Sequence, residues 1–294
     1  MIRFTILGAL TAMNGAREFT PTTPKVCQVL ALLLSRAGRV VGFRSLVEEL
    51  WEEDPPKTAL STAQTYIYQL RKAIERESPQ GLLVTRPFGY ILRVDGERLD
   101  AHVFQRLLGE GRRALADGRY AEASRKLAQG LELWTGPVLA DVVQGPLLRT
   151  YQVHLEEERL RALELRIEAD VMLGRHRELV GELKALAATY PHHEWFHGQL
   201  ISALCRSGRR SEALHAYRDV RTVLSRDLGI DPSRELQDLH QAVLTTELPA
   251  GPATVSATVS ATVSATVPAD VAAKGPEARF AGRPLELIRR SSSG

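Results

Sequence analysis

Residues 59–90 constrain the fold of this chain more than any other segment. Apolar side chains recur there at steps of three and four residues, at Leu60, Ala63, Ile67, Leu70 and Ile74. This spacing predicts a helix that buries one stripe against a core. The sequence LLVTRPFGYIL that follows predicts two short strands around a turn at residues 85–89.

The opposite face of this helix is rich in hydrogen-bond donors and positive charge. It presents Thr62, Gln64, Thr65, Tyr68, Gln69, Arg71 and Lys72, with Glu75 as its only acid. Such groups read base edges and phosphates when a helix lies in a major groove. We therefore expect these residues to contact DNA, together with Arg86 and Phe88 of the turn. Arg86 can reach a phosphate or an adjacent minor groove. The alternative is that Arg71, Lys72 and Arg86 form an ordinary solvated surface.

The charge of the chain is clustered rather than large. Its 294 residues carry a net charge of only +3, so a nucleic-acid surface has to come from local concentration. Residues 57–93 contain six Lys or Arg, whereas residues 48–54 contain five acids and no base. The two cysteines lie within apolar helical patterns and indicate buried thiols in a reducing compartment. No stretch has the apolar length of a membrane span, and a signal-peptide cleavage region is absent, so a cytoplasmic protein is expected.

The first domain is expected to span residues 1–96. Alternating apolar residues at its start predict short strands, with Asn14-Gly15 as a hairpin turn. A helix follows from Pro24, with Thr23 as its cap, and stops at Gly38. A second helix covers residues 43–51, and the loop at residues 52–57 contains Pro55-Pro56, which cannot continue a helix. Strands, three helices and a terminal hairpin in this order predict a winged helix-turn-helix like that of response-regulator output domains.

The second domain, residues 97–248, is expected to be helical and tetratricopeptide-like. Gly-Arg pairs at residues 118, 174 and 208 each separate two helical patterns, and the last two pairs lie 34 residues apart. The longer first interval places an inserted loop or extra helix near Trp134 to Pro146. Residues 249–294 contain tandem Ala-Thr-Val-Ser units and are expected to be a disordered tail. The fold class is thus mainly α with a small N-terminal β-sheet.

One pattern suggests chemistry that the rest of the sequence does not support. His193 to His197 matches H-E-x-x-H, which on a helix can bind zinc. No third ligand follows at the spacing of the extended motif, so the segment is better interpreted as the first helix of the next repeat. No catalytic residue, metal ligand or cofactor is expected.

The complete arrangement resembles the SARP family, the streptomycete antibiotic regulatory proteins. In the first domain the resemblance rests on Val40, residues 46–51, Pro55-Pro56, residues 65–67 and 70–74, and residues 87–90. In the second, which resembles the bacterial transcriptional activator domain, it rests on residues 131–136, 208–209, 212–214 and 227–232. Family members often have Ser-Arg where this chain has Tyr68-Gln69, so one cation is lost and base preference or affinity is expected to differ. No G-x-x-x-x-G-K-[ST] motif is present, so ATP-dependent control is not expected.

The resemblance implies a transcriptional activator of a secondary-metabolite gene cluster. Such a protein binds direct repeats in promoter DNA, as a homodimer or as tandem protomers, and recruits RNA polymerase through its sigma factor and neighbouring surfaces. The acidic run beside the DNA-reading helix is the expected polymerase contact, at Glu48, Glu49, Glu52, Glu53 and Asp54. A solvated helix end is an equally good interpretation of that run. Two alternatives remain open at the level of the whole chain: a tetratricopeptide adaptor that binds protein, and a repressor with the same DNA-binding domain.

Overall fold

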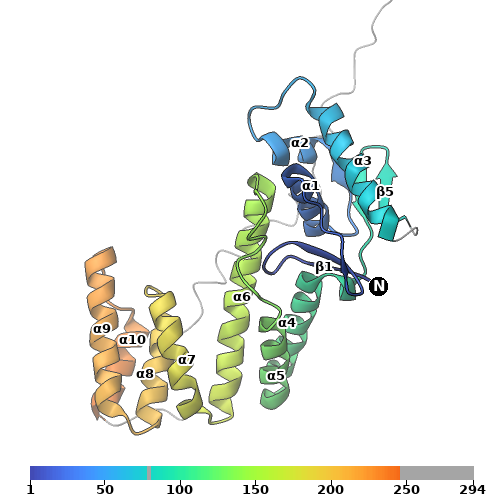
Figure 1. Cartoon of the computed structure of the whole chain (residues 1–294). Helices are drawn as coiled ribbons and strands as arrows, with labels where there is room; N and C mark the ends of the chain where they lie inside the picture. Colours follow the sequence, from blue (N-terminus) through green and yellow to red (C-terminus); the bar gives the residue numbers. More distant parts are fainter. Residues whose placement is uncertain (78–80, 246–294) are drawn as a thin grey trace, which may run out of the picture.

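The computed structural model describes residues 1–77 and 81–245 and is mainly helical (Figure 1). An antiparallel sheet opens the chain, with the order β1 (Ile2–Thr5), β2 (Thr11–Asn14) and β3 (Arg17–Glu18). Three helices follow: α1 (Pro24–Ser35), α2 (Phe43–Trp51) and α3 (Ala59–Glu77). A second sheet has the order β4 (Val41–Gly42), β6 (Gly89–Leu92), β5 (Leu83–Arg86). The predicted winged helix-turn-helix arrangement is confirmed, with two small sheets instead of one.

Two glycines of this region are needed for specific reasons. Gly15 has a φ of +61°, a left-handed angle that favours glycine in the turn between β2 and β3. Gly89 begins β6 opposite Gly42 of β4, and a Cβ atom at Gly89 would overlap the backbone oxygen of Val41. The second sheet therefore holds the wing against β4 at a distance that only glycine allows.

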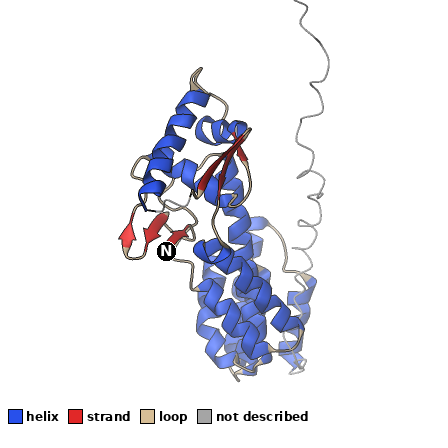
Figure 2. Ribbon diagram, turned by 90° about the vertical axis from the view of Figure 1, so that its right-hand side faces the viewer, coloured by secondary structure: helices blue, strands red, loops and turns tan. Residues whose placement is uncertain are grey.

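The rest of the described chain is a stack of helices (Figure 2). After a short 3-10 turn at Gly96–Arg98 come α4 (Asp100–Ala116), α5 (Tyr120–Leu131), α6 (Pro146–Met172), α7 (His176–Thr189), α8 (Glu194–Arg206), α9 (Arg210–Leu228) and α10 (Arg234–Thr245).

The Gly-Arg pairs join successive helices by one repeated turn. Gly118, Gly174 and Gly208 all have left-handed φ angles between +73° and +79°. In each turn the amide of the following arginine donates to the carbonyl five residues earlier, on Ala114, Asp170 or Leu204. This is the bond that closes a Schellman motif at a helix end. The sequence repeat is therefore a repeat of local structure.

The interval between α5 and α6 is an inserted loop, as predicted, and it packs on the N-terminal segment. Its amides at Thr135, Leu139 and Ala140 donate to the carbonyls of Leu7, Ile6 and Gly8, at 2.8, 3.0 and 3.1 Å. In the opposite direction, the Leu10 amide donates to Asp141 at 2.7 Å. The loop thus joins the connection between β1 and β2 to the helical region by hydrogen bonds.

Buried apolar residues form two clusters that do not divide at residue 96. The first extends from Ile2 to Ala169 and includes α1, α3, α4 and much of α6, and the second extends from Ile167 to Val243. At the junction the Asp100 carboxylate accepts from the amides of Ile6 and Leu7 at 2.9 to 3.0 Å. Burial raises the pKa of Asp100, and these amide bonds oppose the rise. The winged helix and α4 to α6 therefore share one core.

Two expectations need correction or completion. Leu60 was assigned to the buried stripe of α3, but its side chain is 48% exposed, and Ala59 takes its place at 7%. Cys27 and Cys205 are free thiols that are only half-buried.

The tail expected at residues 249–294 lies outside the described residues. Among residues 1–77 and 81–245, no helix has the length and apolar character required to cross a membrane.

The tight approach at Gly89 predicts that Gly89→Ala destabilises the protein. The added methyl group meets the Val41 backbone, which has to shift together with β4. We expect the free energy of unfolding, measured by urea titration, to fall by about 1–3 kcal/mol. Gly96→Ala is the matched control, because a Cβ there meets nothing within 4 Å, and it should change stability by less than about 0.5 kcal/mol. Equal effects of the two substitutions would contradict this explanation.

Candidate nucleic-acid interface

Helix α3 lies on the outside of the winged helix, beside β5 (Figure 1). Its buried side chains are Ala59, Ala63, Ile67, Leu70 and Ile74, and the helix packs against α1 and α2. On the α2 side, Tyr66 stacks on Trp51 with ring centroids 6.5 Å apart. These contacts fix the rotation of α3 and therefore decide which of its side chains face solvent.

The exposed line farthest from the buried stripe consists of Ser61, Thr65, Tyr68 and Lys72. Successive residues of an α-helix are rotated by about 100°, which places these four on one side, opposite Ala63 and Leu70. All four are exposed, and Tyr68 is 63% accessible. Gln64 and Gln69 flank the line and are also exposed, whereas Thr62 is half-buried at its edge.

Ser61 was not among the residues selected from the sequence. Placing Leu60 in the buried stripe rotated the expected exposed face toward Thr62. A stripe that begins at Ala59 instead puts Ser61 four residues before Thr65 and seven before Tyr68, on the same side of the helix.

Arg71 differs from its neighbours because its guanidinium turns toward the wing. Nη1 donates to the Leu83 carbonyl at 2.7 Å and Nη2 donates to the Thr85 hydroxyl at 2.8 Å. Its Nη1 also lies 3.9 Å from Glu75, and the side chain is 29% exposed. Arg71 thus connects α3 to β5.

The wing is the tight connection between β5 and β6. Arg86 pairs with Gly89, and Pro87 and Phe88 form the turn between them. The Phe88 carbonyl accepts from the Phe43 amide at 3.3 Å, which fixes the turn against the start of α2. Arg86 is exposed, and Phe88 is 77% exposed although it is a large apolar side chain. The structure therefore leaves both predicted wing residues accessible beside α3.

The acidic run does not form one surface, and the assignment of Glu49 as a polymerase contact is wrong. Glu49 is 1% exposed, and its carboxylate accepts from the amides of Gly145, Leu147 and Leu148 at 2.6, 3.0 and 3.1 Å. These amides belong to the N-terminus of α6, whose free donors and dipole favour a negative charge. Gln28 donates to the same carboxylate at 3.1 Å. Glu49 is a structural residue.

The other acids of the run remain accessible. Glu52 forms an ion pair with Arg149 of α6 at 2.9 Å, and this hydrogen bond lowers the pKa of Glu52. Glu48, Glu53 and Asp54 are exposed. A partner that meets this loop therefore encounters three or four carboxylates and not five.

The histidine pattern does not bring its two imidazoles to one site. His193 precedes the first residue of α8, and its Nε2 lies 3.4 Å from Glu164. His197 lies within α8, and its Nε2 lies 3.0 Å from the Pro191 carbonyl oxygen. In the described part of the chain, no group of three His, Cys, Asp or Glu side chains is arranged to hold a metal ion.

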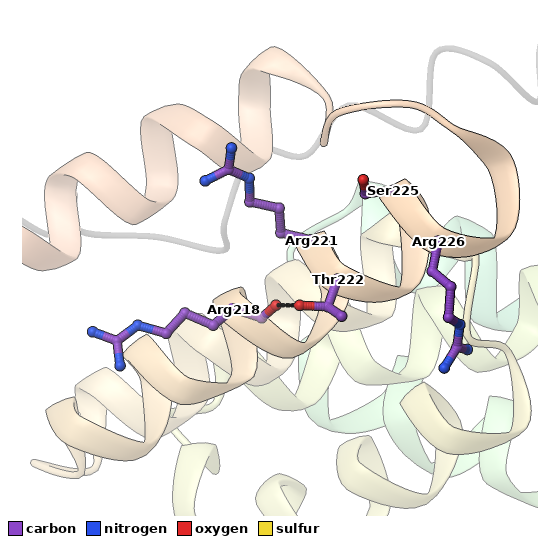
Figure 3. A pocket seen from close by; sticks show the side chains of 5 residues that line it. All are labelled: Arg218, Arg221, Thr222, Ser225 and Arg226. Atoms are coloured by element: carbon purple, nitrogen blue, oxygen red, sulfur yellow. Dashed lines mark hydrogen bonds between the residues drawn. The ribbon is translucent and has the colours of Figure 1, made fainter.

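A surface depression on α9 is also rich in arginine, but its cations diverge (Figure 3). Arg218 and Arg226 extend in opposite directions along the helix. Arg226 donates to Asp227 at 2.6 Å, and Arg221 lies 3.7 Å from Asp231. Two of the three arginines therefore have acidic neighbours, and the three side chains do not converge on a common ligand position.

Comparisons with known proteins agree with this arrangement. Residues 17–92 match the family of the C-terminal domain of transcriptional regulatory proteins, and residues 99–244 match the bacterial transcriptional activator domain. The regulatory protein DnrI of Streptomyces peucetius is 41% identical over 253 residues, which cover 84% of this chain and 93% of the relative. The regulatory protein AfsR of Streptomyces griseus is 38% identical, and this chain spans a quarter of its length, 25%.

A solved structure has the same fold. The structure of Mycobacterium tuberculosis EmbR in complex with a low affinity phosphopeptide superimposes with a TM-score of 0.81 and is 34% identical. The match covers 90% of this chain and 70% of the EmbR chain. The order of winged helix and helical repeats is therefore shared across both halves.

The position of Glu49 predicts a large loss of stability in Glu49→Ala. The substitution leaves the three α6 amides without their acceptor inside the core, whereas Gln28 loses one bond and keeps its bond to the Glu49 backbone carbonyl. We expect the free energy of unfolding to fall by roughly 2–4 kcal/mol in urea titrations. The adjacent exposed residue provides the control, and Glu48→Ala should change stability by less than about 0.5 kcal/mol. A Glu49→Ala protein as stable as Glu48→Ala would refute the capping role.

Proposed function

The chain belongs to the SARP family of transcriptional regulators, and from this premise we propose that it binds promoter DNA through α3 and the wing and activates transcription. The observation that carries the proposal is the exposed polar and cationic line of α3 beside an exposed wing. Both elements are fixed by packing, so the backbone positions that carry these side chains are set before a ligand arrives.

Each part of this surface suits a different feature of duplex DNA. A major groove admits an α-helix, and glutamine side chains such as Gln64 and Gln69 pair with adenine edges. Lys72 and Arg86 supply the positive charge that phosphates require. Phe88 at the wing tip offers an apolar surface of the kind that enters minor grooves. We assign base reading to the helix and positioning to the cations.

The operator and the partner follow from the family. We propose that two protomers bind direct repeats about one helical turn apart, so that both occupy the same side of the duplex. The carboxylates of Glu48 at the end of α2 and of Glu53 and Asp54 on the α2–α3 loop then face RNA polymerase and its sigma factor. The target is the promoter of a secondary-metabolite gene cluster, the protein acts on the nucleoid in the cytoplasm, and it catalyses no reaction.

The phosphate contact assigned to Lys72 can be tested by salt titration. A lysine that neutralises one phosphate releases one counterion, so Lys72→Ala should lower the slope of log affinity against log salt by about 0.9. The measurement is fluorescence anisotropy with promoter fragments from beside its own coding region. Arg112→Ala removes the same charge from an exposed position on α4 and should leave the slope unchanged. If both variants change the slope equally, α3 is not the contact surface.

The activating surface can be separated from the DNA surface. We expect replacement of Glu48 and Glu53 by Gln and of Asp54 by Asn to reduce transcription by purified polymerase while DNA affinity is maintained or raised. The control makes the same change in charge at exposed Asp219, Glu235 and Asp238 of α9 and α10 and should retain full output. Transcription that falls when the unmodified protein is added would identify a repressor instead.

A further inference from the structure

Among the polar residues that α3 presents, Arg71 already has partners within the protein. Its two terminal nitrogens donate to the Leu83 carbonyl and the Thr85 hydroxyl of β5 at 2.7 and 2.8 Å. Only 29% of the side chain is exposed. Lys72, the next residue, is exposed and reaches solvent. Two adjacent cations of one helix therefore have different surroundings.

The strand that Arg71 contacts is the outermost strand of its sheet. The strand order is β4-β6-β5, so β5 forms its ladder with β6 only. An edge strand leaves half of its backbone groups without a partner in the sheet. The Leu83 carbonyl accepts from Arg71, and the Thr85 hydroxyl two residues further along the strand accepts the second bond. Arg71 thus supplies α3 with a lateral hydrogen-bonded connection to the wing.

We propose that Arg71 is a positioning residue, which sets the angle between α3 and the wing so that both reach DNA together. A guanidinium is a planar fork whose donors have a fixed separation, so two simultaneous bonds fix the wing in a way that a lysine cannot. The bases are then read from Ser61, Thr65 and Tyr68 and from the flanking glutamines, while Lys72 contacts a phosphate. This inference rests on the proposed DNA-binding function and assigns a role within it.

The test is a double-mutant cycle on promoter DNA with Arg71→Ala and Arg86→Ala. If Arg71 places the wing, the Arg86 contact is already lost in Arg71→Ala. We then expect each single variant to weaken binding by roughly tenfold, and the double variant to be no weaker than Arg71→Ala within about twofold. If Arg71 contacts DNA independently, the two losses multiply, and that result overturns the proposal.

Lys72→Ala combined with Arg86→Ala is the matched control. Lys72 is adjacent to Arg71 but makes no described contact with the wing, so these two losses should multiply. Arg71→Lys provides a second criterion because it keeps the charge and loses the two-bond fork. Binding as weak as that of Arg71→Ala supports positioning, and full recovery of affinity in Arg71→Lys overturns it.

Amide hydrogen exchange tests the proposal without DNA. In Arg71→Ala we expect residues 83–92 to exchange at least about threefold faster, because the wing loses its lateral support, while the buried stripe of α3 keeps its protection. Unchanged exchange in residues 83–92 overturns the positioning role. If the unmodified protein fails to bind promoter DNA, the proposed function fails by itself, and the exchange experiment still decides whether Arg71 holds the wing.

Discussion

The carboxylate of Glu49 at the N-terminus of α6 is the interaction on which the relation between the two halves depends. It is buried, and it accepts from three backbone amides that lie 96 to 99 residues further along the chain. Asp100 and Asp141 do the same for the amides of Ile6, Leu7 and Leu10. Carboxylates suit this junction because a helix N-terminus and a non-sheet segment bring amides into the core that have no other acceptor. One continuous apolar cluster can then cross from the winged helix into the helical stack.

This junction also determines how α3 is held. Tyr66 of α3 stacks on Trp51 of α2, and α2 carries Glu49, which caps α6. Helix α6 contributes Leu148 and Leu155 to the first cluster and Ile167 and Val171 to the second. Helix α3 is thus connected through packed elements to the distant repeats, without a linker of the kind that lets domains move independently. On the proposed function, the spacing of two operator repeats would also fix the spacing of the two helical stacks.

The sequence predicted those features that depend on neighbours along the chain. The order of the elements, the wing turn and the Gly-Arg turns follow from local periodicity and from backbone angles that glycine favours. Features that depend on distant residues could not be predicted. Glu49 has the same local pattern as Glu48, and only the amides of residues 145–148 distinguish them. Ala59 and Leu60 both satisfy helical spacing, and packing selected the smaller side chain. Arg71 is indistinguishable from Lys72 until β5 is in place.

The distribution of exposed charge also depends on contacts between distant residues. A net charge of +3 is too small to attract a polyanion from a distance, but the charges of this half are separated along it. Lys72, Arg76 and Arg86 are exposed on α3 and the wing beside Glu75, while Glu53 and Asp54 are exposed together with Lys57 on the loop that precedes α3. This separation of charge orients the protein beside a polyanion more than it attracts it. A phosphate backbone attracts the cationic end and repels the acidic end. Burial of Glu49 and pairing of Glu52 with Arg149 reduce the negative end. The packing that joins the two halves therefore also sets the strength of this orienting field.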